Sequence, residues 1–214
     1  MRREWRSSVF IIVGMFLVLS CVQPKVDVTR EIRSFRPDQY QEVFDKWTRE
    51  FQILPVDGIE NVLTARATYL SHEFRWAYVV RVAYDLQLSP DERQELNGRE
   101  FRALDQYNEF FVTVMSGISG SDDLDPQKNI WHIRLSDDRG QSLAPSAIEK
   151  IRKPTINEMK YFVFDKGQRT AYRIRFPAAA PGGRRIIAKS TRFFTLSFSS
   201  ALGQSVLRWE TTKN

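Results

Sequence analysis

Two histidines are the first side chains in this sequence that could do chemistry. His72 and Glu73 begin like the zinc-binding pattern H-E-x-x-H, but Trp76 stands where the second histidine must be. One imidazole cannot form the paired ligand set of that motif, and His132 lies far along the chain. We therefore expect structural or surface roles for both histidines, with no metal site and no cofactor.

A serine in a glycine-containing stretch is the next candidate. Residues 117–121 read G-I-S-G-S, which approaches a nucleophile elbow with Ser119 as the nucleophile. That motif, G-x-S-x-G, needs glycine where Ser121 stands. A nucleophilic serine also needs a positioned base, and no spacing assigns a histidine to it. We expect a loop here, and no catalytic residue.

The same loop is acidic, since residues 119–125 read S-G-S-D-D-L-D. Calcium prefers oxygen ligands, and three close carboxylates could supply some of them. The spacing does not match an EF-hand loop, which needs a glycine and a distal glutamate. A cation site and a solvated turn both stay open for residues 119–125.

Five arginines in the C-terminal part form a candidate anion-binding patch. Two of them share one face of an expected strand, and three follow shortly after: Arg173, Arg175, Arg184, Arg185 and Arg192. Guanidinium groups bind phosphate or sulfate through charge-assisted hydrogen bonds. Lipid headgroups or an anionic polymer would fit the patch, and an ordinary solvated sheet face is the alternative. We expect no nucleic acid, because no stacking platform accompanies the charge.

The single cysteine, Cys21, follows the apolar run 9–19, and Arg2, Arg3 and Arg6 precede that run. The run is shorter than the roughly 20 residues of a bilayer-spanning helix, and it has the proportions of a signal peptide. The sequence V-L-S-C at 18–21 resembles the lipobox of bacterial lipoproteins, although Leu19 departs from its commonest small residue.

This resemblance implies cleavage after residue 20 and acylation of the Cys21 thiol, with two or three acyl chains that anchor firmly. Val22 stands where an aspartate would retain the protein at the inner membrane, so the outer membrane, facing the periplasm, is the expected location. A cleaved signal or an anchor helix with an incidental cysteine is the alternative. We expect a signal peptide over 1–20, a lipidated tether over 21–36 and one globular domain over 37–214.

Composition bounds the class of the mature chain. Aromatic residues make up 13% of the chain and hydrophobic residues 42%, which predicts a folded core rather than disorder. The formal net charge is +6, and the first 20 residues carry a surplus of two, so about +4 remains. This mildly basic balance favours anionic surfaces such as lipid headgroups.

Hydrophobic spacing predicts helices in the first half of the chain. An aromatic stripe at helical spacing predicts a helix over 40–51, and strict alternation predicts the first strand over 63–69. Ser71 can cap a helix that runs to about Leu86. Ser89, Pro90 and Glu92 form the start of another, with a capping box and a first-turn proline.

The rest of the chain is expected to be strands, over 110–115, 131–135, 161–164, 171–176, 193–198 and 205–209. Regular turn signals between them favour a β-sandwich. We predict a mainly β fold with helices: an immunoglobulin-like sandwich with a helical insertion after its first strand and an N-terminal helix. An α+β fold with helices on one face of an antiparallel sheet is the alternative.

These observations predict a lipid-anchored envelope protein whose domain is a non-enzymatic binding or scaffolding module. Its partners would be the membrane, through the lipid, and another envelope protein or an anionic envelope polymer. A hydrolase or metal-dependent enzyme built from scattered carboxylates and one histidine is the second hypothesis. The third is an accessory protein for secretion or assembly that docks through a sheet edge.

Overall fold

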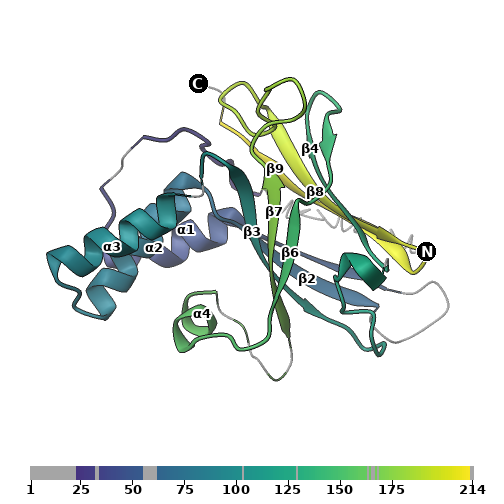
Figure 1. Ribbon diagram of the computed structural model, residues 1–214, viewed down its shortest axis with the longest axis horizontal. Coiled ribbons are helices and arrows are strands. Elements are labelled where there is room, and N and C mark those ends of the chain that lie inside the picture. The colour runs from purple at the N-terminus through teal and green to yellow at the C-terminus, as the bar shows by residue number, and fades with distance from the viewer. Residues whose placement is uncertain are drawn as a thin grey trace, which may run out of the picture.

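Two antiparallel β-sheets and a group of helices build the chain (Figure 1). The computed structural model describes residues 23–31, 34–54, 62–102, 104–128, 130–162, 164, 167 and 169–212. Within these residues, no helix is long and apolar enough to cross a membrane. The arrangement confirms the predicted class, a β-sandwich with helices.

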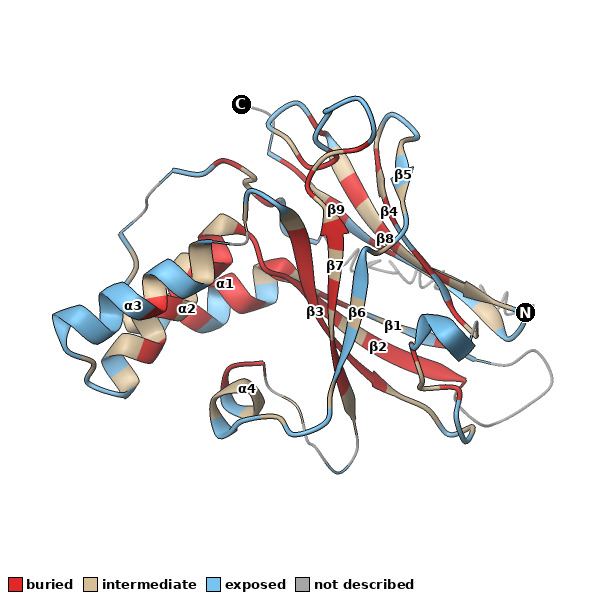
Figure 2. Cartoon of the chain, viewed as in Figure 1, coloured by how far each residue is buried: buried red, intermediate tan, exposed pale blue. Residues whose placement is uncertain are grey.

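The larger sheet has five strands in the order β1-β2-β3-β7-β6, and every neighbouring pair is antiparallel. β2 and β3 lie in its centre and are buried along most of their length, whereas the edge strand β6 is largely exposed (Figure 2). The bounds are β1 Thr48–Ile53, β2 Leu63–Tyr69, β3 Tyr107–Met115, β6 Ala147–Ile151 and β7 Thr170–Pro177.

The smaller sheet has four strands in the order β5-β4-β8-β9. β9 also lies against β1 of the larger sheet, so the sandwich is closed on that side. The Trp209 ring of β9 contacts Phe194 of its own sheet and Phe110 of the other, with centroids 5.2 and 5.6 Å away. The bounds are β4 His132–Asp137, β5 Ser142–Leu143, β8 Phe193–Ser200 and β9 Gly203–Glu210.

Helices cover the face of the larger sheet that turns away from the smaller one (Figure 1). Successive residues of a strand point to opposite faces, so Phe110 packs between the sheets while Phe111 stacks on Phe162, with ring centroids 3.9 Å apart. These helices are η1 Pro37–Gln39, α1 Tyr40–Trp47, α2 His72–Asp85, α3 Pro90–Phe101 and α4 Ile156–Tyr161, whereas η2 Pro126–Lys128 lies in the connection between β3 and β4.

Several predicted elements are confirmed by the structure. The Ser71 hydroxyl accepts from Phe74 N at the start of α2, and Ser89 forms the predicted capping box with Glu92 at the start of α3. Strands occupy most of the predicted residues 63–69, 110–115, 131–135, 171–176, 193–198 and 205–209.

The N-terminal helix is shorter than predicted, and an additional strand follows it. α1 ends at Trp47, and the chain continues as β1, so the predicted helix over 40–51 is wrong in its last turn. Thr48 is already extended, and the Trp47 carbonyl accepts a hydrogen bond from Trp209 Nε1 at 3.0 Å. The helical insertion α2–α3 follows the strand 63–69 as predicted, but this strand is the second of the structure because β1 precedes it.

The predicted strand over 161–164 is also wrong. Tyr161 is the last residue of α4, which begins with a capping box between Thr155 and Glu158. Phe162 then turns onto Phe111 of the sheet. The strand that pairs with β7 at the sheet edge is instead β6, which sequence analysis did not predict.

The two ends of the sandwich differ in what they carry. At one end, named the proximal end here, β1 begins while β7 and β9 end; at the opposite, distal end, β1 ends while β7 and β9 begin. The proximal end lies at the top of Figure 1, near the C-terminus. Each strand of about eight residues separates the two ends by about 25 Å.

The segment expected as a tether is packed on the proximal end from Pro24 onward. Val26 is fully buried and forms a parallel bridge with Thr211. Val26 N donates to Glu210 O at 2.7 Å, and Thr212 N donates to Val26 O at 2.8 Å. Arg49 Nη2 also donates to Pro24 O at 3.1 Å. The part of the expected tether around Val26 therefore belongs to the folded domain, because an apolar side chain and its backbone complete the domain here.

Candidate functional site

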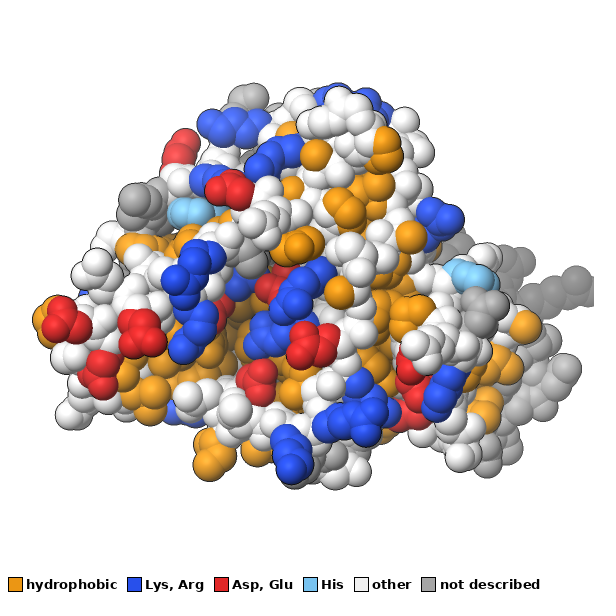
Figure 3. All heavy atoms as spheres, viewed as in Figure 1, with side chains coloured by type: hydrophobic (Ala, Val, Ile, Leu, Met, Phe, Trp, Pro, Cys, Tyr) orange, Lys and Arg blue, Asp and Glu red, His pale blue; other side chains and the backbone are white. Residues whose placement is uncertain are grey.

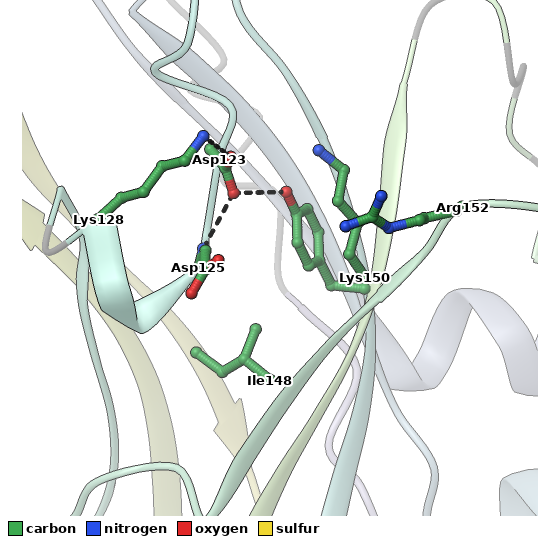
Figure 4. Close-up of a pocket in the computed structure, with 7 residues that line it drawn as sticks. Asp123, Asp125, Lys128, Ile148, Lys150 and Arg152 are labelled. Atoms are coloured by element: carbon green, nitrogen blue, oxygen red, sulfur yellow. Dashed lines mark hydrogen bonds and ion pairs between the residues drawn. The ribbon is translucent and has the colours of Figure 1, made fainter.

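A polar cleft of about 510 Å³ opens at the distal end of the sandwich. It lies between the loop that leads from β3 to η2 and the strands β6 and β7 (Figure 4). Its volume falls within the usual range of ligand sites. The lining residues are Asp123, Asp125, Lys128, Ile148, Lys150, Arg152 and Tyr172.

One wall of the cleft is cationic. Ile148, Lys150 and Arg152 alternate along the chain from β6, so their side chains share the face that borders the cleft. Lys150 and Arg152 are exposed and form no ion pair among the described residues. Lys150 Nζ lies 5.7 Å from the centroid of the Tyr172 ring. These two cations are therefore available to an anionic ligand.

The opposite wall is an ordered acidic turn. Lys128 pairs with Asp123, and Asp123 Oδ1 accepts from Asp125 N at 3.1 Å. Asp125 Oδ1 in turn accepts from Gln127 N at 2.9 Å, at the start of η2. The hydrogen bond from Lys128 holds the pKa of Asp123 below its usual value. The wall thus stays charged at neutral pH, and Asp125 presents a carboxylate toward the cleft.

The Tyr172 ring forms the floor between the two walls. Its hydroxyl oxygen accepts from Leu124 N at 3.3 Å and lies 3.2 Å from Asp122 O. Burial raises the pKa of Tyr172 above its usual value. The hydroxyl therefore stays protonated and engaged with the loop, and it is a poor nucleophile or general base.

A second, more apolar groove of about 390 Å³ continues from the cleft along the open side of the sandwich. Ile148 borders both. The second groove runs between β4 and the segment that leads into β6, and its lining includes Trp131, Ile133, Pro145 and Ala147. A ligand larger than the polar cleft could extend along this side.

Arg173 and Arg175 of the predicted anion patch lie in an ion-pair cluster on the helix-facing side of β7. Arg175 Nε donates to Glu109 Oε1 at 3.0 Å, and Arg173 Nη2 donates to Glu158 Oε1 at 3.1 Å. The structure therefore uses these two guanidinium groups to join the sheet to the helices.

The other three arginines of the patch lie at the proximal end, in or beside the loop between β7 and β8. Arg184 pairs with Asp137, Arg185 with Asp105 and Arg192 with Asp138, at 3.4, 3.5 and 2.8 Å. The five predicted residues are thus divided between two places, and anion binding by them stays a prediction.

The structure also shows where the two candidate histidines lie. The His72 ring packs edge-on against Phe101, 5.0 Å between centroids, and burial lowers its pKa. His132 is exposed and lines two grooves whose lining contains no carboxylate.

In the acidic loop, Asp122 accepts from Thr170 and Asp123 from Lys128, so their carboxylates are engaged separately. No group of three potential ligands that could hold a metal ion occurs within the described ranges. Cys21 lies outside the described residues.

Sequence reasoning missed Lys150 and Arg152, the two cations of the cationic wall. Residues 145–152 read P-S-A-I-E-K-I-R, which has neither a clean alternation nor an apolar run. The loop at 119–125 was noticed for its acids, and in the structure Asp123 and Asp125 of this loop line the wall opposite Lys150 and Arg152 (Figure 4).

Comparisons with known proteins give one similar structure. No family model and no curated protein matches the chain. A solved structure described as a novel protein of unknown function from Burkholderia pseudomallei is similar over 82% of this chain and 90% of that one. The sequence identity is 7% and the TM-score 0.36.

Proposed function

We propose that this chain is a lipid-anchored protein of the bacterial envelope whose domain binds an acidic or zwitterionic group of another envelope component. The lipobox-like residues 18–21 support the anchor. The observation that carries the binding role is the pair of exposed cations, Lys150 and Arg152, which border the distal cleft without a carboxylate partner in the described part of the chain.

The position of the cleft supports this role. The described chain enters the domain at the proximal end, where Pro24 and Val26 are held. The cleft lies at the distal end, about 25 Å away along the strands. An anchor at Cys21 would therefore leave the cleft open toward the periplasm, where a soluble or membrane-bound partner could reach it.

The chemistry of the lining favours binding over turnover. Lys150 and Arg152 can hold a carboxylate or phosphate, and Asp125 can accept from an amine or hydroxyl. Tyr172 is held protonated by burial, and no histidine borders this cleft. The proposal is therefore a module that recognises charge and shape.

Two measurements test the proposal on the full-length protein purified from membranes. Intact mass should show loss of residues 1–20 and acyl chains on Cys21, and Cys21→Ser should stall processing or release the protein. A bare thiol with residues 1–20 still attached would refute the anchor.

For the cleft, binding of citrate and inorganic phosphate should be followed by calorimetry. Lys150→Glu with Arg152→Glu should abolish it, while Lys153→Glu, an exposed neighbour outside the cleft, should reduce it about twofold at most. Equal effects of these variants would refute a specific cleft. Turnover of a hydrolase substrate that one polar substitution in the cleft destroys would refute the non-enzymatic role.

A further inference from the structure

The described chain leaves little distance between the proposed lipid and the domain. Pro24 O accepts from Arg49, whose side chain also donates to the carbonyl groups of Lys46, Thr48 and Arg208. Three residues of fully extended chain reach at most about 11 Å. A lipid on Cys21 would therefore hold the proximal end within about one headgroup layer of the membrane, whatever path residues 21–24 take.

The surface that would face the membrane is rich in cations. Three exposed cations there, Lys25, Arg139 and Lys189, form no ion pair among the described residues. Four more each pair with one carboxylate, namely Arg184, Arg185, Arg192 and Arg208. Lys and Arg side chains lie along the top of the molecule in Figure 3, where Figure 1 places the proximal loops.

A cleft of about 550 Å³ lies within this surface, directly beside the point of chain entry. The guanidinium of Arg208 stacks on the Phe193 ring, 3.5 Å from its centroid. Its Nε and Nη2 groups bond the Glu210 carboxylate, each at 2.8 Å, so only the remaining N–H groups of the stacked guanidinium can reach an anion. Lys25, Arg192 and Arg208 border the cleft together with one carboxylate, Glu210, so its cations outnumber its acids, as a phosphate group requires.

We propose that the proximal end docks directly on anionic phospholipid headgroups, with Lys25, Lys189 and Arg208 among the contacts. The inference rests on the proposed lipid anchor and adds an orientation to it. The proximal end contacts the headgroups, and the strands of the sandwich run away from the bilayer toward the distal end. Each basic side chain beside an anionic leaflet strengthens such attraction by roughly fivefold.

The test measures which end of the domain touches the bilayer. Thr212→Cys marks the proximal end and Leu202→Cys marks the hairpin between β8 and β9 at the distal end. Both residues are exposed. Each lipidated full-length variant is labelled with a fluorophore at the new thiol and reconstituted into vesicles with a headgroup quencher. The vesicles contain either phosphatidylcholine alone or phosphatidylcholine with phosphatidylglycerol.

In phosphatidylglycerol vesicles, the label at 212 should be quenched about threefold or more over the label at 202, because the two sites lie about 25 Å apart. High salt, or Lys25→Glu with Lys189→Glu, should bring the two values together while the protein stays with the vesicles. Lys150→Glu with Arg152→Glu, a matched charge change at the distal end, should leave the difference unchanged.

The outcomes separate the two proposals. Equal quenching at both sites on vesicles that retain the protein would overturn the docked orientation and leave the anchor intact. Quenching at 212 that is the same with and without phosphatidylglycerol, at high salt, and in the variant Lys25→Glu with Lys189→Glu would overturn headgroup recognition. Protein that does not float with the vesicles at all would overturn the anchor, and the docked orientation with it.

Discussion

Arg75 of α2 and Glu109 of β3 form an ion pair at the boundary between the helices and the larger sheet, and each side chain is about 5% exposed or less. Three further partners join the cluster: Glu100 lies 2.8 Å from Arg75, and Arg175 and Arg173 lie 3.0 and 3.8 Å from Glu109. Burial raises the pKa of Glu109, but the positive charges of Arg75 and Arg173 outweigh it, so the pKa is below its usual value.

Glu109→Gln should destabilise the domain by about 3 kcal/mol, because it leaves Arg75 buried with one carboxylate partner fewer. Urea unfolding followed by tryptophan fluorescence measures the loss. Glu149→Gln is the matched control, since its carboxylate is 62% exposed and lies 3.6 Å from Arg175. It should cost less than about 1 kcal/mol. Similar losses for both variants would contradict the role assigned to the buried pair.

Asp85 at the end of α2 gives the stability a defined dependence on pH. Its Oδ2 accepts from Arg81, Lys160 and Tyr161, at 2.9, 2.8 and 3.0 Å, which joins α2 to α4. Desolvation raises the pKa of Asp85, but these hydrogen bonds outweigh that effect and lower it to about 2.

The unfolded chain has an aspartate pKa near 3.9. The contribution of Asp85 is therefore fully present above about pH 4 and is lost as the pH falls through 2. Asp85→Asn should cost about 2 kcal/mol or less at pH 6, and the wild type and the variant should converge near pH 2. Urea titrations at several pH values measure this difference. A gap that stays constant from pH 6 to pH 2 would contradict the assignment.

Gly203 at the start of β9 allows the backbone of β9 to pack closely against β1 on the closed side of the sandwich. Its φ is +146°, and a Cβ at this position would lie 2.6 Å from Ile53 Cγ2. Gly203→Ala should therefore cost about 1–3 kcal/mol through strain and overlap. In an Ile53→Ala background the same change should cost clearly less, because the overlap is removed and the backbone strain remains. A double-mutant cycle of unfolding free energies measures the coupling, and additive costs would rule out the contact.

The sequence predicted the elements that carry strong local signals. Ser71 and Ser89 cap the two helices of the insertion as expected, because their side-chain oxygens satisfy backbone N–H groups locally. The alternation in 63–69 also predicted β2, although nearly all residues on both faces of this strand are buried. A capping box was also present at Thr155 and Glu158, but the aromatic run after it favoured a strand.

Where the local sequence signals were ambiguous, tertiary contacts determined which type of element formed. The stripe from Tyr40 to Phe51 fits a helix throughout, yet Phe51 belongs to β1 and contacts Phe198, with centroids 5.1 Å apart. Pairing with β2 and the hydrogen bond from Trp209 to the Trp47 carbonyl favour the strand, and neither is encoded locally.

The candidate site could not be predicted from the sequence for a similar reason. Lys150 and Arg152 sit on or beside an exposed edge strand with no clear period, and their neighbours across the cleft come from a distant loop. The same limit applies to the arginine patch: the sequence gives the number of cations but not the carboxylates that pair with them.

Arg49 decides how tightly the N-terminal segment is held. Its side chain is largely buried at the closed side of the sandwich, and it bonds Pro24 O and Arg208 O, at 3.1 and 3.0 Å. Arg49→Gln removes these bonds, while the backbone pairing of Val26 with Glu210 and Thr212 stays possible. Amide hydrogen exchange at Val26 and Thr212 should therefore accelerate by about tenfold or more, because the opening of this segment costs less.

The exchange of Phe110 and Val112 in the centre of the sheet should change by the global loss of stability alone. Arg66→Gln is the control on the neighbouring strand, because Arg66 pairs with Glu50 on the opposite face of the sheet from Arg49. Its Val26 exchange should match that of the wild type. If Arg49→Gln accelerated all amides equally, Arg49 would stabilise the whole fold rather than hold the entering chain.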